Sequence, residues 1–426
     1  MVTTVNIAKT VYGGDGIGRL GDGRVVFVPG AFAGEVVKAE ITGEKKRFAR
    51  ARLVSVEDPS PDRTGQGEPP VPGMVYANLS RKAETAAKDD QLRNFFERAR
   101  IAVEGPFEGP AGEPAPVPPG YRNKVVYHFA KADGGWRIGY RKEPGHEIVD
   151  VFDDPLARPE INAKLPEVRR GVVAMLTQGA EAVRKSFERK ENVTVRWTKR
   201  TGVRWWAGDA PADVMLREET CGRGFDVPAD GFYQVNPEVG DALAKAVAAE
   251  YAKGPAPATL LDLYCGVGVL GLTCVAAASG ATPRLVGVES GRTAVEAARR
   301  NAAALGIDAK FFSESAAGFM KRTRSLEGAT VIVDPPRGGM EPQAARKLAS
   351  SGAKRILCVS CDPATLVRDL RILAPAFAVK SVRWFDMFPR TARFETFAVL
   401  ERRAGDACKI RCNGEKTHVD FREGGE

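Results

Sequence analysis

Two residues near the C-terminal end of the chain have the types that covalent catalysis needs. Cys361, in the segment VSCDP, follows an apolar run and stands directly before a predicted helix that begins near Ala364. The partial positive charge at a helix start favours a thiolate, and an accessible thiolate is a nucleophile. Glu395, in the segment FPRTARFE, is a candidate proton acceptor. The pair predicts a reaction in which a thiolate attacks and a carboxylate removes a proton.

A glycine-containing loop is the second feature with chemical meaning. Gly266, Gly268 and Gly271 follow the apolar run 260–264 and have the spacing of a dinucleotide-binding loop. Glu289 ends the next apolar run, where a carboxylate can accept hydrogen bonds from both ribose hydroxyls of a nucleotide. Nicotinamide enzymes and S-adenosylmethionine-dependent methyltransferases both use these features, so they leave the identity of the cofactor open.

The segment DPPR at residues 334–337 favours methyl transfer. Prolines cannot continue a central strand, so the segment could be a simple turn at the end of an apolar run. In a doubly wound sheet, however, ligands bind at the carboxyl ends of the strands. Asp334 would stand at such an end, together with the glycine loop and Glu289.

Methylation of carbon 5 of uracil needs this combination of residues. Carbon 5 is too weak a nucleophile to attack a sulfonium methyl, whereas thiolate addition at carbon 6 creates an enolate that can attack. Cys361 would therefore activate the base, and Glu395 would remove the remaining proton of carbon 5 before the thiol leaves. A stacked base shields its carbon 6, so we expect the target nucleotide to flip out of its stack.

Other cysteine chemistry stays open as an alternative. Cys358 and Cys361 form a C-x-x-C motif that could be a redox pair, and Cys408 with Cys412 could complete a zinc site. Cys358 stands inside an apolar run, where a packed small side chain is expected. The late pair stands in a polar tail, which does not favour ordered metal geometry, so we expect no bound metal.

The order of predicted strands and helices divides the chain into three parts that must position these residues. Residues 1–56 alternate apolar and polar residues between glycine turns, which predicts a small, OB-like β-barrel with a basic end. Residues 75–230 follow a loop rich in Pro and Gly and predict a central α+β module. Residues 231–403 alternate strands with Ala-rich helices, which predicts a doubly wound, Rossmann-like α/β sheet that ends in an antiparallel pair.

Composition and charge restrict the class of protein. Of the 426 residues, 43% are hydrophobic and 27% are charged, which excludes a largely disordered or fibrous protein. Lys and Arg outnumber Asp and Glu by 63 to 54, and a basic balance favours an anionic partner such as nucleic acid. Irregularly spaced cysteines, no signal-like start and no long apolar run predict a cytoplasmic protein without membrane association. We expect a monomer.

The motifs, taken in order, resemble the RNA uracil-5-methyltransferase family over nearly the whole chain. They are LLDLYCGVG, VGVE, VDPPRGG, VSCDPATLVRDL and FPRTARFE. The segments YRNK and FYQVN are similar to further motifs of that family, and residues 1–56 resemble its TRAM domain. The resemblance implies that Cys361 is the nucleophile and Glu395 the proton acceptor. It assigns contacts with S-adenosylmethionine to Gln234, Tyr264, Glu289 and Asp334, and Gly266 and Gly268 of the glycine loop complete the predicted cofactor-binding residues.

The resemblance also implies an RNA substrate, bound by the barrel and positioned by the central module. By analogy with barrel-bearing relatives we expect 23S ribosomal RNA, and transfer RNA is the alternative. Two other classes stay open: a non-catalytic RNA-binding protein and a nicotinamide-dependent oxidoreductase. The presence of both Cys361 and Glu395 argues against them, because neither class needs this pair.

Three positions depart from the pattern of the family. Many relatives carry a cysteine quartet for an iron–sulfur cluster near the first linker, where this chain has no cysteine, so we expect no cluster. Val269 stands where relatives often have Asn, which removes one polar contact with the cofactor. Arg393 stands where relatives usually have His, two residues before Glu395, which changes the surroundings of the proton acceptor.

Overall fold

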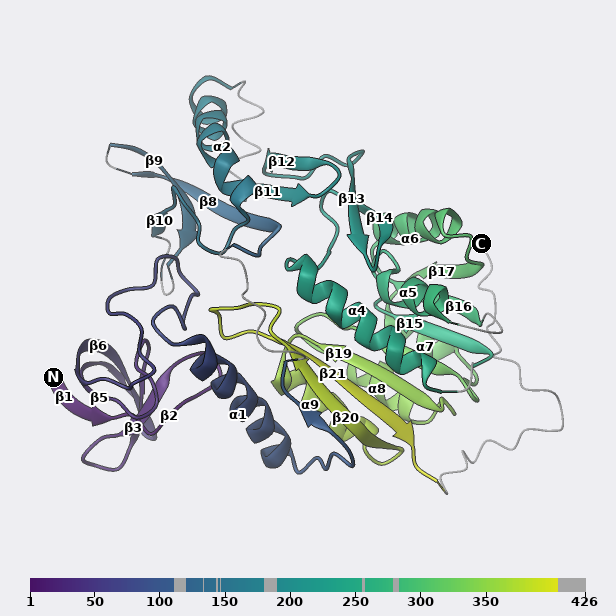
Figure 1. Cartoon of the computed structure of the whole chain (residues 1–426), viewed down its shortest axis with the longest axis horizontal. Coiled ribbons are helices and arrows are strands. Elements are labelled where there is room, and N and C mark those ends of the chain that lie inside the picture. Colours follow the sequence, from purple (N-terminus) through teal and green to yellow (C-terminus); the bar gives the residue numbers. More distant parts are fainter. Residues whose placement is uncertain are drawn as a thin grey trace.

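The structure is a computed structural model that describes residues 1–110, 120–132, 134–142, 145, 147–179, 190–254, 257–278 and 283–404. Cys408 and Cys412, the second half of the alternative zinc site, lie outside the described residues. The described elements form three groups, which follow one another along the chain from purple to yellow in Figure 1. None of the helices in these ranges is both long and apolar enough to cross a membrane.

The N-terminal group, here called the N-terminal barrel (residues 2–58), is a curved six-stranded sheet in the order β1-β5-β6-β4-β3-β2. Alternate residues, among them Val26 and Val37, point into one apolar interior. The chain after β1 closes the sheet, because the N–H of Ala8 donates a hydrogen bond to O of Ile17 in β3 at 2.8 Å. The predicted small barrel is confirmed. Its strands are β1 (Val2–Asn6), β2 (Lys9–Thr10), β3 (Gly16–Arg19), β4 (Val25–Val28), β5 (Val36–Glu44) and β6 (Phe48–Asp58).

The central group is an antiparallel five-stranded sheet in the order β10-β9-β8-β11-β12, with helix α2 (Pro159–Gln178) on one face. Val125, Tyr127 and Phe129 alternate along β8 and pack with Val168 of α2. The strands are β8 (Lys124–Ala132), β9 (Gly135–Arg141), β10 (Ile148–Asp150), β11 (Asn192–Thr198) and β12 (Gly202–Ala207). The hairpin β13 (Met215–Thr220) and β14 (Arg223–Pro228) follows and packs in the C-terminal core through Phe225.

The C-terminal group is an eight-stranded sheet in the order β17-β16-β15-β18-β19-β21-β20-β7. From β17 to β19 neighbouring strands are parallel, and they are continuous apolar runs because a separate core cluster covers each face. β21 is antiparallel to both of its neighbours, which confirms the closing antiparallel pair. Chain order reverses between β15 and β18, so a ligand crevice is expected at the C-terminal ends of these two strands.

The bounds of the C-terminal elements follow the alternation of strand and helix. The strands are β15 (Thr259–Leu263), β16 (Arg284–Glu289), β17 (Ala309–Ser313), β18 (Thr330–Val333), β19 (Arg355–Ser360), β20 (Phe377–Phe385) and β21 (Glu395–Arg402). The helices are α4 (Pro237–Ala252), α5 (Val269–Ala277), α6 (Arg292–Ala304), α7 (Ala316–Arg322), α8 (Pro342–Ala349) and α9 (Pro363–Leu373). The doubly wound sheet predicted from the sequence is confirmed.

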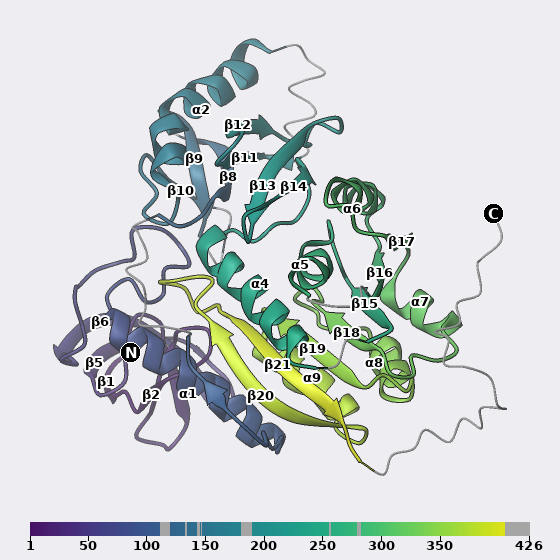
Figure 2. The same cartoon turned by 45° about the vertical axis from the view of Figure 1, so that its right-hand side comes forward.

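Helix α1 (Arg81–Ala99) and strand β7 (Phe107–Glu108) pack with the C-terminal sheet, although the sequence grouped them with residues 75–230. Leu92 and Phe96 of α1 lie in the same core cluster as the strands of that sheet, and β7 pairs with β20. Figures 1 and 2 both show α1 between the N-terminal barrel and β20. Periodicity identifies a helix but not its packing partner, so the sequence could not place α1.

Candidate active site

The C-terminal ends of β15, β16, β18 and β19 open into one cavity of about 800 Å³. Seven of the eight site residues predicted from the sequence line it, namely Gln234, Tyr264, Gly266, Glu289, Asp334, Cys361 and Glu395. The eighth, Gly268, is not part of the lining and forms the N-cap of α5. Val269, the first residue of α5, lines the cavity with an apolar side chain. The topology therefore brings together residues that are up to 161 positions apart, from Gln234 to Glu395.

The loop between β15 and α5 has backbone conformations that favour glycine. Gly266 and Gly268 have φ angles of 53° and 87°, where a side chain causes strain. Gly271 is needed for a different reason, because a Cβ there would lie 2.7 Å from Oδ2 of Asp262. Without a side chain, the Gly271 N–H donates a hydrogen bond to that oxygen at 2.9 Å. The loop can thus bring its backbone close to a bound nucleotide.

The carboxylate of Glu289 is fixed at the edge of the cavity. Its Oε1 accepts hydrogen bonds from the N–H of Gly291 at 2.8 Å and from Oγ of Ser290 at 3.0 Å. Its Oε2 accepts one from the N–H of Gly266 at 3.3 Å. A carboxylate has about four acceptor positions, so Glu289 retains capacity for further donors. Two acceptor oxygens held in this way suit the two adjacent hydroxyls of a ribose.

Two further carboxyl groups, those of Asp262 and Asp334, line the interior of the cavity. Burial raises the pKa of Asp262 to about 8 and the pKa of Asp334 to about 7. Oδ1 of Asp262 is buried and has no hydrogen-bond partner among the described residues. A ligand that carries a positive charge would favour the ionised form of both groups. Together with Glu289, these residues fit a nucleoside that carries a cation.

Cys361 lies at the cavity wall, directly after β19 and before the N-cap of α9. That N-cap is Asp362, whose Oδ1 accepts hydrogen bonds from two N–H groups of the first turn at 3.0 and 3.2 Å. The helix start is therefore satisfied by a carboxylate. Burial, followed by the carboxylates of Glu395 and Asp334, raises the pKa of Cys361 to about 12. The prediction that the helix start favours a thiolate is thus wrong for the protein without ligands.

Glu395 is the first residue of β21 and lies opposite Cys361, which directly follows the neighbouring antiparallel strand β19. Ser360 of β19 pairs with Thr396 of β21, so the next residues outward are Cys361 and Glu395. Glu395 is 3% exposed, and its Oε2 has no hydrogen-bond partner in the described part of the chain. Burial, with the charge of Asp334, holds the pKa of Glu395 well above its usual range. A buried carboxylate oxygen without a partner, beside a thiol, indicates a group that acts on a ligand.

Two residues at the cavity were not singled out from the sequence. Arg337 lines the cavity, and its charge lowers the pKa of both Cys361 and Glu395, against the effect of burial. Phe232 also lines the cavity and is 69% exposed, an uncommon exposure for so large an apolar side chain. Each stands in a motif noted above, DPPR and FYQVN, but only the folded chain shows that both side chains reach the site.

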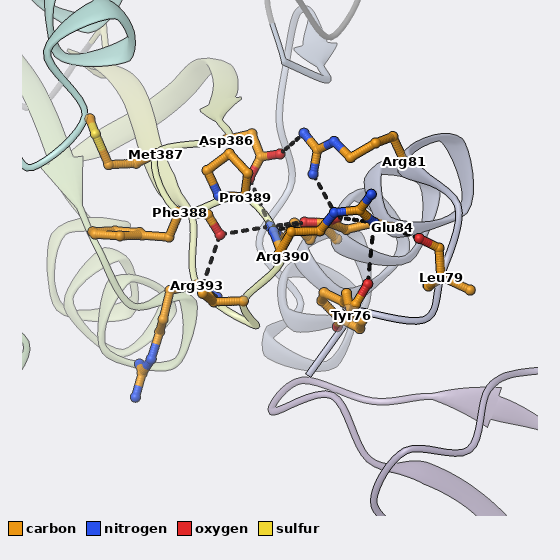
Figure 3. A network of polar contacts seen from close by, with 12 residues as sticks. Tyr76, Leu79, Arg81, Glu84, Asp386, Met387, Phe388, Pro389, Arg390 and Arg393 are labelled. Atoms are coloured by element: carbon orange, nitrogen blue, oxygen red, sulfur yellow. Dashed lines mark hydrogen bonds and ion pairs between the residues drawn. The ribbon is translucent and has the colours of Figure 1, made fainter. Parts of the chain in front are cut away.

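Helix α1 holds residues 386–394, the loop that leads into Glu395. Glu84 of α1 is at the centre of this contact in Figure 3. Its Oε1 accepts hydrogen bonds from the N–H of Arg390 at 2.7 Å and from Nζ of Lys88 at 2.8 Å. Nζ of Lys88 also donates to Oδ1 of Asp386 at 2.7 Å. Because Lys88 is fully buried, the loop is fixed by a charge network that water does not screen.

Residue Arg390 of this loop has a left-handed backbone with φ of 67°, which costs free energy for a residue with a side chain. Its guanidinium donates hydrogen bonds to O of Leu79 at 2.5 Å and O of Tyr76 at 3.3 Å. The hydroxyl of Tyr121, from the central group, donates to O of Pro389 at 3.2 Å. The conformation of the 386–394 loop therefore depends on contacts with residues 76–79, which precede α1, and with the central group, in addition to α1 itself.

Replacement of Lys88 by methionine tests the strength of this network. Lys88→Met should lower the free energy of unfolding by about 3–5 kcal/mol, because it leaves the carboxylates of Glu84 and Asp386 buried beside each other. Urea denaturation followed by circular dichroism measures the effect. The matched control is Lys245→Met, which removes an exposed ion pair with Asp241 and should leave the midpoint almost unchanged. Equal effects of the two variants would contradict a buried charge network.

Two family patterns match the chain. Residues 223–403 match the family described as tRNA (Uracil-5-)-methyltransferase, and residues 2–54 match the TRAM domain. Uncharacterized RNA methyltransferases are similar along nearly their whole length. The protein of this description from Streptomyces coelicolor is 32% identical, over 93% of this chain and 92% of its own. The uncharacterized RNA methyltransferase from Thermotoga maritima is 28% identical, over 94% of this chain and 99% of its own.

A solved structure has the same overall fold. The Pyrococcus abyssi tRNA (uracil-54, C5)-methyltransferase, determined in complex with S-adenosyl-L-homocysteine, matches with a TM-score of 0.68. The match covers 93% of this chain and 99% of the Pyrococcus abyssi chain at 23% sequence identity. The arrangement of barrel, central sheet and doubly wound sheet is therefore shared, whereas the identity is too low to transfer a substrate.

Proposed function

The chain belongs to the S-adenosylmethionine-dependent RNA (uracil-5-)-methyltransferase family, and from this premise we propose that it methylates one uridine through a covalent adduct of Cys361. One observation carries the proposal: Cys361 and Glu395 lie opposite each other at the wall of the cavity that Glu289 and Asp334 also line. A nucleophile and a proton acceptor thus face the same space as the nucleotide-binding strand ends.

The methyl donor fits the part of the cavity formed by β15, β16 and β18. When bound, S-adenosylmethionine supplies an electrophilic methyl group on a positively charged sulfur. Glu289 accepts hydrogen bonds from the ribose hydroxyls, and the loop at Gly266 allows the backbone to approach the nucleoside. Gln234 and Tyr264 complete the wall, and Asp334 faces the cationic end. The resemblance implied contacts of Gln234, Tyr264, Glu289 and Asp334 with the methyl donor, and we propose these individual roles for this chain.

The first step is addition of the Cys361 thiolate to carbon 6 of the uracil. The sulfur–carbon bond forms, and the electron pair of the 5,6 double bond moves toward carbon 5 and oxygen 4 as an enolate. Burial opposes both the thiolate and the enolate, so a fixed cation is needed nearby. Arg337 lies in the cavity and already lowers the pKa of Cys361, so it stabilises negative charge at this position.

The second half of the reaction needs a proton acceptor. Carbon 5 would take the methyl group as the bond between that group and the sulfonium sulfur breaks and S-adenosylhomocysteine leaves with the electron pair. Carbon 5 would then carry both the methyl group and its original proton. Glu395 takes that proton, the 5,6 double bond forms again, and the bond between Cys361 and carbon 6 breaks with release of the thiolate. The raised pKa of Glu395 matches this task, because a more basic carboxylate binds the proton more strongly.

The target base must enter a cavity whose reactive groups lie below the surface. Glu395 is buried, whereas Phe232 is mostly exposed and lines the same cavity. An exposed aromatic ring can stack on a nucleobase and so offset the cost of removing that base from its own stack. We assign Phe232 to this contact, with the flipped uracil between its ring and the segment that carries Cys361.

Ribosomal RNA and transfer RNA are both candidate substrates. We predicted 23S ribosomal RNA from the presence of a barrel, and that prediction is retained as the first candidate to test. The fold of the Pyrococcus abyssi enzyme, a tRNA (uracil-54, C5)-methyltransferase, covers 93% of this chain. A shared fold does not identify the substrate, so both kinds of RNA are tested.

Transfer of labelled methyl groups to purified RNAs tests the proposed function. The protein is incubated with S-adenosylmethionine and, separately, with unmodified 23S ribosomal RNA and unmodified transfer RNA, and the nucleosides are then identified by mass spectrometry. We expect 5-methyluridine in only one of the two RNAs. Label in another nucleoside would refute the uracil assignment, and label only in transfer RNA would refute the ribosomal prediction.

The pH dependence should reflect the raised pKa values in the cavity. Because the reactive forms of Cys361 and Glu395 are deprotonated, a raised pKa means that both forms increase as pH rises. We expect kcat/KM for RNA to increase between about pH 6 and 9. Arg337→Gln should move this rise to higher pH, because it removes the charge that lowers both pKa values.

The controls for this pH profile separate chemistry from binding. Arg337→Lys keeps the positive charge and should retain a profile closer to that of the wild type. RNA affinity is measured at each pH in the presence of S-adenosylhomocysteine, so that no methyl transfer takes place. A profile that falls with pH, or a shift to lower pH in Arg337→Gln, would contradict the assignment of Arg337.

A further inference from the structure

Arg393 connects the N-terminal barrel to the segment that carries the nucleophile. Its Nη1 donates a hydrogen bond to Oδ2 of Asp362 at 2.8 Å and another to the hydroxyl of Tyr12 at 2.9 Å. The hydroxyl of Tyr12 itself donates to Oδ2 of Asp362 at 3.2 Å. Tyr12 belongs to the turn between β2 and β3, and Asp362 directly follows Cys361. A barrel residue therefore reaches the neighbour of the catalytic cysteine.

The ring of Tyr12 is fixed from several sides. It packs edge to face against Phe95 of α1, with centroids 5.4 Å apart, and against Phe394, with centroids 6.1 Å apart. The guanidinium carbon of Arg393 lies 5.7 Å from the centroid of the Tyr12 ring. The position of Arg393 thus depends on the barrel, although Arg393 itself belongs to the 386–394 loop.

Arg393 retains donors that can reach a ligand. Its side chain is 41% exposed, and it lines the same cavity as Cys361 and Glu395. In the described part of the chain, both hydrogen bonds of the guanidinium are donated by Nη1, and Nε and Nη2 donate none. Figure 3 shows Arg393 directed away from Glu84 and the charge network of α1. A guanidinium with free donors suits an anion with two oxygens.

Asp362 neutralises only part of the positive charge of Arg393. Oδ1 of Asp362 already accepts two hydrogen bonds from N–H groups at the start of α9, whose partial positive charge stabilises the carboxylate. The two residues also differ in depth: Glu395 is 3% exposed, whereas the side chain of Arg393 is 41% exposed. A nucleotide that inserts its base toward Cys361 keeps its phosphate with the RNA backbone, at the exposed level of Arg393.

We propose that Arg393 binds the phosphate of the target nucleotide and that Tyr12 of the N-terminal barrel holds its guanidinium for this contact. The proposal rests on the proposed function and adds a substrate contact to it. It also gives the barrel a second role, because binding of RNA by the barrel and insertion of the uridine then share one side chain. Arg393 contacts the substrate, and Tyr12 is a positioning residue that acts through Arg393.

RNA affinity as a function of salt tests this inference. Affinity is measured by fluorescence anisotropy with S-adenosylhomocysteine present, for wild type, Arg393→Gln, Tyr12→Phe and the double variant, using the RNA that is methylated. Loss of one phosphate contact should lower the slope of log K against log salt by about 0.7 to 0.9 in Arg393→Gln. Tyr12→Phe keeps both charge and ring packing, so it should weaken binding by about 2- to 12-fold with an unchanged slope.

The double variant and a matched control decide between a phosphate contact and a purely structural one. If Tyr12 acts through Arg393, Tyr12→Phe should have no further effect in the Arg393→Gln background. The control Arg292→Gln removes an exposed arginine of α6 outside the cavity lining and should keep the wild-type slope. The inference fails if Arg393→Gln keeps the wild-type slope and its effect on RNA affinity adds to that of Tyr12→Phe. Wild type without 5-methyluridine activity would refute the proposed function instead.

Discussion

Cys361→Ala should transfer methyl groups to RNA at least about 10³-fold more slowly than wild type, which in most assays is no detectable transfer. The loss is expected to be this large because carbon 5 of uracil has no other route to an enolate once thiolate addition at carbon 6 is removed. S-adenosylmethionine should still bind, since Glu289 and the loop at Gly266 are untouched. Methyl transfer is followed with labelled donor, and donor affinity with calorimetry.

The matched control is a second cysteine, in β19, the strand that leads into Cys361. Cys358→Ala removes a buried sulfur three residues before Cys361, in the apolar core of the sheet. It should lower stability slightly and leave methyl transfer within a few-fold of wild type. A redox pair would predict that both replacements are equally harmful. Activity of Cys361→Ala, or equal loss in Cys358→Ala, would rule out the adduct mechanism.

The sequence predicted most of the candidate site because parallel strands bring their carboxyl ends to one edge of a sheet. Motifs that end four strands must then meet, and the cavity is lined by residues from Gln234 to Glu395. The position of Cys361 opposite Glu395 also follows from the closing antiparallel pair. The meeting of the strand ends and the position of Cys361 opposite Glu395 both follow from the order and direction of the strands. The alternation of predicted strands and helices along the sequence indicates that arrangement.

The properties that depend on tertiary contacts could not be predicted in the same way. A helix start after Cys361 was visible in the sequence, but the capping of that start by Asp362 and the burial of the thiol reverse the expected pKa shift. The sequence showed only that Arg393 stands where relatives usually have His. Its partner Tyr12 is 381 residues away, and no local pattern connects the two. The packing of α1 against the 386–394 loop is equally distant in sequence.

Glu395→Gln should complete methyl transfer to carbon 5 but fail to release the product. Glutamine has nearly the same size and cannot accept the proton, so the bond between Cys361 and carbon 6 stays intact. Turnover should fall by about 10²- to 10⁴-fold, the range for loss of a positioned general base. A methyl-labelled species that contains both protein and RNA should accumulate and remain during denaturing electrophoresis.

The double variant Cys361→Ala/Glu395→Gln distinguishes this adduct from RNA that is simply bound tightly. It should form no species that resists denaturation, because the sulfur that makes the bond is absent. An adduct without the methyl label would mean that Glu395 acts before methyl transfer, for example on the thiol of Cys361, whose pKa its charge already raises. Normal turnover of Glu395→Gln would mean that another group removes the proton, and among the residues lining the cavity the carboxyl groups of Asp262 and Asp334 have pKa values raised toward neutrality.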